Sequence, residues 1–245
     1  MNNRSWSERS IAYTPERDRD IQMINPVFKA NFFIITCAFF TTGSSAQITN
    51  GSFETGHFDG WSANDTQSTS FDPLAVRPAN TPPALAFLYP DSPFADGYPV
   101  TDGTYSASHG FDGHGGLITI SQDAFINDVE LSFDWGASLF LLGEGSARLF
   151  NVNFRNTNDN TLLSSINIAS FEAVFGTQDT GIVIGETVDL TAYLGTTVNI
   201  EFEWVVPDQA TGPAASFIDN IAIVPSPSGL TFLCISGTIA CKRRR

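Results

Sequence analysis

Apolar and polar residues alternate along most of the chain after Ile48, and this alternation constrains the fold more than any other feature. Every second residue is apolar through 129–135, 150–154 and 198–206, and 188–194 places apolar residues on one face of a further regular run. Successive side chains of a strand point to opposite faces of a sheet, so these runs are typical of strands with one face on a core and the other in water. No segment of ten or more residues here has a convincing helical period. The sequence therefore predicts an all-β fold.

Gly, Asn, Asp and Pro interrupt the alternation at the spacing expected of turns between antiparallel strands. Residues 47–224 leave room for about eight to ten strands, and we expect a single antiparallel β-sandwich with one well-buried core. The Pro- and Asp-rich stretch 73–99 predicts long loops over the sandwich, with one possible strand at 85–89. The glycine-rich stretch 110–116, which follows His109 and contains His114, predicts a turn.

The first 46 residues carry the pattern of an export signal. Residues 1–22 are polar and charged without apolar periodicity, and we interpret them as an over-extended start. Residues 23–46 then supply the basic Lys29, an apolar run at 32–40 and a small-residue site ending at Ala46, which together are typical of a cleavable secretory signal peptide. The alternative is a buried helix or strand of a cytosolic domain.

The C-terminal segment 225–245 has three parts. It opens with the tripeptide Pro225-Ser226-Pro227, continues with an apolar run at 230–241 and ends in the basic cluster 242–245. The apolar run is shorter than the roughly 20 residues that a membrane span needs, although a short signal of this kind can be held briefly in a membrane. The alternative is a last core strand with a basic end.

Charge and cysteine content exclude several classes of function. Asp and Glu number 26 against 12 Lys and Arg in the whole chain, and 47–224 keeps three arginines against 22 acidic residues. Such a domain repels phosphate backbones, which argues against nucleic-acid binding, and it suits cations such as calcium. The three cysteines, Cys37, Cys234 and Cys241, all lie in the terminal segments. The domain therefore has no disulfide framework, Cys-based zinc site or Cys nucleophile.

Motifs of known enzyme classes are missing from the sequence. There is no Gly-x-Ser-x-Gly elbow, no histidine pair at metal-binding spacing and no phosphate-binding glycine loop. Paired carboxylates of a glycoside hydrolase stay open, because nothing selects two of the 22 acidic residues. The sequence favours a non-catalytic protein, with a secreted hydrolase as the remaining enzymatic alternative.

The aromatic residues divide into core candidates and ligand candidates. The three tryptophans of the domain continue apolar patterns, and we expect them in the core. Aromatic residues in polar loops are better ligand candidates, because a ring beside Asp96, Asp102 or Asp112 can meet a sugar ring and its hydroxyls. These ligand candidates are Tyr89, Phe94, Tyr98 and Phe111.

The C-terminal segment resembles the PEP-CTERM sorting signal of Gram-negative bacteria. The resemblance rests on Val224-Pro225-Ser226-Pro227, the apolar run 230–241 and the basic end. It implies transient anchoring in the inner membrane, cleavage by an exosortase, and release to the cell surface or an exopolysaccharide-rich matrix. Ser226 stands where the family motif has Glu, and whether this departure permits sorting stays open.

The domain resembles the galactose-binding-like jelly rolls found in many carbohydrate-binding modules. The resemblance rests on three motifs in order: 50–54 with Gly60-Trp61, then 188–202, then the closing 217–221. It implies a jelly-roll sandwich that covers nearly the whole of 47–224. The fold hosts unrelated functions, so the resemblance is poorly specific for the ligand.

A structural calcium ion is a further implication of this resemblance. In such modules the ion lies where the first and last strands meet, and residue-by-residue transfer nominates Glu54, Asp219 and Asn50 together with backbone carbonyls. Calcium accepts six to eight oxygen ligands, so this donor set is chemically reasonable. The alternative is that Glu54 and Asp219 cap turns or accept backbone hydrogen bonds.

These observations predict an exported, non-catalytic β-sandwich at the cell surface or in the extracellular matrix. Its expected partners are a polysaccharide, signal peptidase and exosortase-type sorting machinery. The alternative function is a structural or adhesive matrix protein without affinity for small sugars.

Overall fold

The computed structural model describes residues 48–66, 72–84, 94–111, 115–207 and 212–225. They form ten strands and one short 3-10 helix, η2 (Thr191–Tyr193). In chain order the strands are β1 (Ser62–Asp65), β2 (Asp72–Pro78), β3 (Tyr105–Phe111), β4 (Gly116–Phe125), β5 (Glu130–Leu141), β6 (Arg148–Asn156), β7 (Leu162–Phe171), β8 (Gly176–Asp189), β9 (Thr197–Val206) and β10 (Ala214–Val224). No described segment forms a helix long and apolar enough to cross a membrane.

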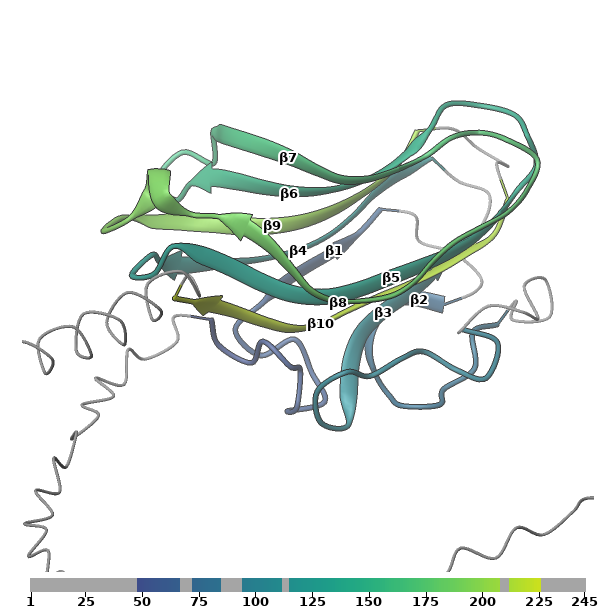
Figure 1. Cartoon of the computed structure of the whole chain (residues 1–245), viewed down its shortest axis with the longest axis horizontal. Coiled ribbons are helices and arrows are strands. Elements are labelled where there is room, and N and C mark those ends of the chain that lie inside the picture. Colours follow the sequence, from purple (N-terminus) through teal and green to yellow (C-terminus); the bar gives the residue numbers. More distant parts are fainter. Residues whose placement is uncertain (1–47, 67–71, 85–93, 112–114, 208–211, 226–245) are drawn as a thin grey trace, which may run out of the picture. The chain divides into compact units, whose positions relative to one another are not determined.

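The strands form two five-stranded antiparallel sheets. The first sheet has the order β1-β4-β9-β6-β7, and the second has the order β2-β3-β10-β5-β8. Strands far apart in the sequence pair directly, since β9 lies between β4 and β6, and β10 lies between β3 and β5. Figure 1 shows β6, β7 and β9 above β5, β8 and β10. The predicted all-β antiparallel sandwich is confirmed.

The core lies between the inner faces of the two sheets. Phe133 of β5 meets Phe202 of β9 edge to face, with ring centroids 5.0 Å apart, and Trp135 of β5 lies 4.9 Å from Phe150 of β6. Such aromatic pairs contribute about 0.5–1.5 kcal/mol each beyond their buried area. The three tryptophans expected in the core are buried there: Trp61, Trp135 and Trp204.

The run 188–194 is not one strand, as the alternation predicted. The strand β8 ends at Asp189, and 191–193 turn into η2, which leaves Ala192 and Leu194 exposed. The carboxylate of Asp189 accepts a hydrogen bond at 2.8 Å from the backbone N–H of Thr191. This local turn competes with the sheet and ends it, because Asp readily bonds the backbone two residues ahead.

Two loop predictions also need correction. The stretch 73–99 is not loop throughout, since most of β2 falls inside it, and Gly110 and Phe111 lie within β3 rather than in a turn. The possible strand at 85–89 lies outside the described residues. β2 was not predicted from the sequence because its prolines suggested a loop. Pro73 and Pro78 lie near the two ends of the strand, where sheets tolerate proline.

The opening segment 48–61 consists of turns, and β1 begins only at Ser62. It nevertheless adjoins the closing strand, because the N–H of Ile221 donates to the carbonyl of Gly51 at 3.0 Å. A Cβ on Gly51 would lie 2.0 Å from the Ile221 carbonyl oxygen, so only glycine fits there. The expected meeting of the first and last motifs is therefore present, although the first motif is not a strand.

Candidate functional site

Part of the outer face of the second sheet, over β3, β10 and part of β5, is covered by another segment of the same chain. We call this the covered face; its buried outward side chains from β3, β5 and β10 include Ser106, Ser108, Ser138, Ala215, Phe217 and Asp219. Phe94 packs on Phe217 with ring centroids 5.9 Å apart, and the hydroxyl of Ser106 donates to the carbonyl of Pro99 at 2.7 Å. The segment 94–104 thus closes this face to large ligands.

Phe94 and Tyr98, two of the predicted ligand aromatics, belong to that cover. Phe94 is 0% and Tyr98 1% exposed, and both pack in a small second core with Phe217. The hydroxyl of Tyr98 donates to Asp72 at 3.1 Å. The expectation that these two rings present an open face to a sugar is therefore corrected. Their polar neighbours in the sequence concealed that the segment folds back onto β10.

Most of the remaining predicted ligand and processing residues lie outside the part of the chain that the structure describes. Tyr89 and the side chain of Phe111 lie outside the described residues, as do Ala46, Ser226 and Pro227. Pro225 is exposed and directly follows β10. The signal peptide and the sorting segment therefore stay predictions.

Glu54 and Asp219, the predicted calcium ligands, both hold the segment 101–105. Asp219 Oδ2 accepts hydrogen bonds from the N–H groups of Thr101 and Asp102 at 2.8 and 3.0 Å. Glu54 Oε1 accepts from the N–H groups of Thr104 and Tyr105 at 2.8 and 2.9 Å. Burial raises the pKa of Asp219 to about 6, although these N–H donors act to lower it. The two carboxylates clamp one loop onto the covered face.

This arrangement does not fit a calcium centre as it stands. N–H donors point at Glu54 Oε1 and at both oxygens of Asp219, whereas calcium needs those lone pairs. The amide of Asn50 is used locally, donating to the His57 carbonyl at 2.9 Å. Within the described part of the chain, no group of three or more His, Cys, Asp or Glu could hold a metal. The geometry agrees with the alternative of backbone hydrogen bonding, and calcium stays an untested prediction.

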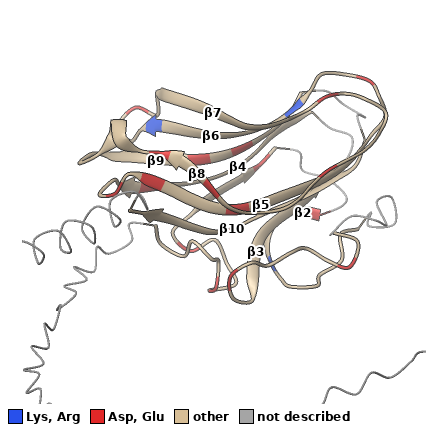
Figure 2. Cartoon of the chain, viewed as in Figure 1, with Lys and Arg blue, Asp and Glu red and all other residues tan. Residues whose placement is uncertain are grey.

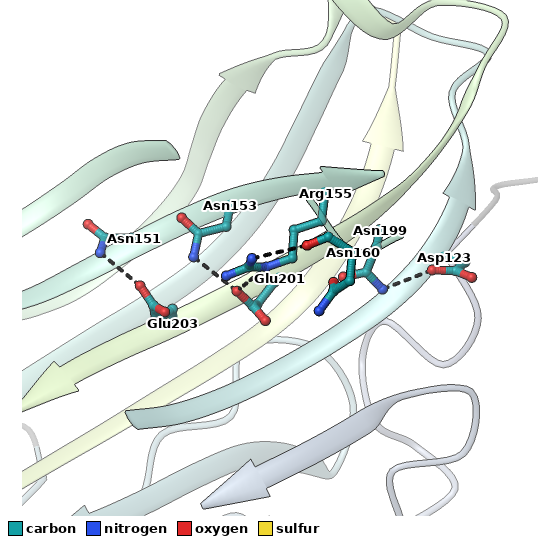
Figure 3. Close-up of polar contacts among 8 residues, drawn as sticks. All are labelled: Asp123, Asn151, Asn153, Arg155, Asn160, Asn199, Glu201 and Glu203. Carbon is teal, nitrogen blue, oxygen red and sulfur yellow. Dashed lines mark hydrogen bonds and ion pairs between the residues drawn. The ribbon is translucent and has the colours of Figure 1, made fainter. Parts of the chain in front are cut away.

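The outer face of the first sheet is polar and is not folded over in this way. Three amide–carboxylate pairs lie there in direct cross-strand register, two between β6 and β9 and one between β9 and β4. The pairs are Asn151 with Glu203 at 3.2 Å, Asn153 with Glu201 at 3.0 Å, and Asn199 with Asp123 at 2.8 Å. Figure 3 shows them in a row. We call this surface, with its three pairs, the open face.

The β9 members of the three pairs follow one another at every second residue, 199, 201 and 203. Because a strand rises about 3.3 Å per residue, the row spans roughly 13 Å along β9. This is enough to lie under a few units of an extended chain molecule.

Buried amides fix the positions of two of these carboxylates. Asn151 and Asn153 are only 8% and 3% exposed, so they orient Glu203 and Glu201 rather than meet a ligand themselves. Asn167 of β7 donates to Asn151 Oδ1 at 2.9 Å, which turns the amide nitrogen of Asn151 toward Glu203. The open face is therefore preorganised by hydrogen bonds that run across three strands.

An exposed aromatic ring lies at one end of the row. Phe125 follows Asp123 by two residues on β4, so both side chains point to the open face, and Phe125 is 44% exposed. At the other end of the row the outward residues become apolar, with Leu117 39% exposed. The polar row is thus bounded by apolar surface at both ends.

A pocket of about 510 Å³ adjoins the row beside Asp123 and Asn199. Its floor is built by Gln122, which accepts a hydrogen bond from the N–H of Thr49 at 2.6 Å and donates to the carbonyls of Thr49 and Gly60 at 3.0 and 2.8 Å. The side-chain amide of Gln122 thus holds the opening segment against β4 through three hydrogen bonds. It also gives the pocket a fixed polar lining.

Sequence reasoning missed the open face as a site. The alternation placed Glu201, Glu203 and Asn199 on the polar side of β9, but that side was interpreted only as solvated. The available signal was the identity of the polar residues, since Asn and Glu rather than Lys or Thr fill successive outward positions. Phe125 was missed because it ends an otherwise regular strand.

A serine–histidine pair exists, but it is enclosed in the core. His109 Nε2 lies 2.5 Å from Ser216 Oγ, and both side chains are buried. The adjoining cavity of about 20 Å³ has room for about one water molecule. Burial lowers the pKa of His109 to about 3, with smaller effects from Arg77 and Arg148. A substrate chain cannot reach this pair, so it does not form the active site of a hydrolase in this conformation.

Comparisons with known proteins give only remote similarity. No protein-family model and no curated protein matches the chain. Among solved structures it is similar to the module TmCBM61 in complex with beta-1,4-galactotriose, at 15% identity and a TM-score of 0.43, over 75% of this chain and 100% of that one. A cleaved adhesin domain of Lys-gingipain from Porphyromonas gingivalis matches at 10% identity and a TM-score of 0.41, over 73% of this chain and 99% of that one.

A third similar structure is the CBM22-1 xylan-binding domain of Xyn10C from Paenibacillus barcinonensis. It matches at 12% identity and a TM-score of 0.36, over 70% of this chain and 89% of that one. All three TM-scores are below 0.5, so the candidate site rests on its own geometry.

Proposed function

We propose that the protein binds a carbohydrate chain on the open face, along β9. The observation that carries this proposal is the row of three amide–carboxylate pairs with Phe125 at its end. Sugars combine apolar C–H faces with many hydroxyl groups. A row of fixed acceptors flanked by an aromatic ring matches both features.

The hydrogen-bonding capacity of the row suits hydroxyl donors. Among the described residues, Glu203 and Asp123 each accept from one amide and keep a second carboxylate oxygen without a hydrogen bond. Asn199 still has donor and acceptor capacity, because its amide makes one bond to Asp123. Since the buried amides already fix the carboxylates, little side-chain entropy is lost when a ligand binds.

Binding to a glycan array by the purified protein tests the proposal, with Phe125→Ala and Glu203→Ala as site variants. While the fold persists, we expect Phe125→Ala to weaken binding about three- to tenfold, as for the loss of one stacking ring, and Glu203→Ala to weaken it about tenfold or more, as for the loss of one hydrogen bond to a charged group. Matched controls lie off the open face: Phe175→Ala removes a ring that is 71% exposed, and Glu186→Ala removes a carboxylate from β8. Site variants that bind like the controls would contradict the proposal.

A structural or adhesive role is the second candidate, and the edge of the sandwich favours it. β7 ends the first sheet, carries no charged residue and exposes Leu162, Leu163 and Ile166. Long uncharged edge strands tend to pair with other chains. Sedimentation of the protein with and without Ile166→Lys tests this role: self-association that the lysine abolishes, together with an array that shows no glycan binding, would favour it.

Export belongs to the same proposal. It is supported by the signal-like segment 23–46 and the sorting-like segment 225–245 in the sequence. We propose release to the cell surface or matrix, where polysaccharide is available. Mass analysis of the protein recovered outside the cells tests both cleavages, and a chain that keeps both segments would contradict them.

A further inference from the structure

The open face is strongly unbalanced in charge. Among the described residues it carries the carboxylates of Asp123, Glu201 and Glu203 and a single cation, Arg155. Arg155 Nε lies 2.9 Å from Glu201 Oε1, so this cation is already paired. Asp123 and Glu203 are bonded only to neutral amides. Two carboxylates of the row therefore have no cationic partner among the described residues.

The other described cations lie elsewhere in the sandwich. Arg148 is 1% exposed and donates to the Gly212 carbonyl. Arg77 donates to the Pro73 carbonyl at 2.6 Å, and its guanidinium lies over the Tyr98 ring at 5.2 Å. These three arginines are the cations of the described residues, so none is free on the open face to bind an anionic group. Figure 2 shows how sparse basic residues are on the strands.

The carboxylates cannot easily move away from an approaching anion. Glu201 and Glu203 are held by the buried amides of Asn153 and Asn151, and Asn167 holds Asn151 in turn. Swinging a carboxylate outward would leave a buried amide without its partner, which is costly. A ligand carboxylate or sulfate lying along β9 therefore meets fixed negative charge within a few ångströms.

We infer that the site selects glycans without negative charge and rejects uronic-acid and sulfated chains. This inference rests on the proposed function and names its ligand class. Hydroxyl groups satisfy the row as donors, whereas a ligand anion meets repulsion, and the one described guanidinium on this face, that of Arg155, is already paired with Glu201. Arginine forks are the usual recognition element for carboxylates and sulfates in proteins, and the row offers none.

Pairs of polysaccharides that share one backbone provide the test. Each neutral member of a panel (galactan, xylan, mixed-linkage glucan and hydroxyethyl cellulose) is compared with its carboxymethylated derivative by affinity electrophoresis at low salt. We expect the derivative of any bound glycan to bind about tenfold more weakly, as for repulsion from two surface carboxylates, and the gap to narrow in 0.5 M salt, where the screening length is only about 4 Å.

The double variant Asp123→Asn/Glu203→Gln sharpens the test, because it removes the unpaired charges, keeps the shapes and leaves each side chain one acceptor oxygen for its amide partner. We expect it to bind the carboxymethylated derivative nearly as well as the neutral parent. Equal or tighter binding of the carboxymethylated glycans by the unmodified protein overturns the selectivity but leaves carbohydrate binding intact. If no member of the panel binds, both the selectivity and the proposed function fail.

Discussion

The two outer faces of the sandwich differ in what lies on them. Part of the second sheet is covered by 94–104, and its outward Ser106 and Asp219 are buried and bonded to that segment. The first sheet carries the open face, whose carboxylates are bonded to amides of neighbouring strands and remain partly accessible. Polar side chains on the covered face bond a distant segment of the chain, whereas those on the open face bond only neighbouring strands. Aromatic rings in a polar loop can therefore belong to the packing of the chain itself, as Phe94 and Tyr98 do.

The cover should contribute far more to stability than the open face. Phe94→Ala empties a fully buried site against Phe217, and we expect it to lower the free energy of unfolding by about 3–5 kcal/mol, measured by denaturant titration. Val174→Ala, at a residue 63% exposed, is the control and should change it by about 0.5 kcal/mol or less. Equal effects at the two positions would mean that 94–104 does not cover the sheet in solution.

The pH dependence of stability should also depend on Asp219, the buried carboxylate of the covered face. Burial raises the pKa of Asp219 to about 6, so the folded protein binds a proton here more readily than the unfolded chain. The contribution of Asp219 to stability is therefore greatest at low pH and is lost as pH rises from about 4 through 6. We expect the stability of the unmodified protein relative to Asp219→Asn to fall by at most about 3 kcal/mol between pH 4 and 7.

The comparison with Asp219→Asn is needed because the titration of His109 changes stability with pH in the opposite direction. Its pKa is lowered to about 3, so its contribution is present above its ordinary value of 6.5 and is lost as pH falls from there. His109 is present in both proteins and cancels in the difference. Chemical denaturation across pH 4–7 measures the difference, and a profile with no slope would contradict the burial of Asp219.

On the open face the amides should affect binding more than folding. Asn151→Ala removes the bond that orients Glu203, and Asn151→Asp replaces it with a second carboxylate beside Glu203. We expect glycan affinity to fall severalfold in the first variant and further in the second, while stability falls by about 1–2 kcal/mol, as for one lost buried hydrogen bond. Calorimetric titration with a neutral glycan measures the affinities of the two variants. If Asn151→Asp bound the glycan more tightly than Asn151→Ala, Asn151 would not position Glu203.

The smallest effect is expected from removing calcium. Hydrogen bonds from 101–105 already occupy Glu54 Oε1 and both oxygens of Asp219, so we expect an excess of chelator to leave the melting temperature unchanged. A ligand that binds only the folded state must raise the melting temperature. A clear drop on chelation, reversed by added calcium, would therefore support the metal site and show that 101–105 rearranges around the ion.

The sequence by itself determined which side of each strand faces the core. The alternation in 198–206 buries Ile200, Phe202 and Trp204 as predicted, because the pleat of a strand enforces a period of two whatever the strand pairs with. It also determined the sandwich class, since half-apolar strands in a domain without a helical pattern are left with another sheet against which to bury their apolar sides. A strand could still be misjudged at its end, as at Asp189, where a side chain bonded the local backbone instead.

Only the tertiary structure decided what happens to the outward sides. Glu203 and Asp219 are both acidic residues on outward positions of strands, yet one lies on the open face and the other is buried beneath Thr101 and Asp102. The difference depends on a segment more than a hundred residues from Asp219 in the chain. The periodicity that places a side chain on a face of a strand is local, whereas covering that face requires long-range contacts that leave no period in the sequence.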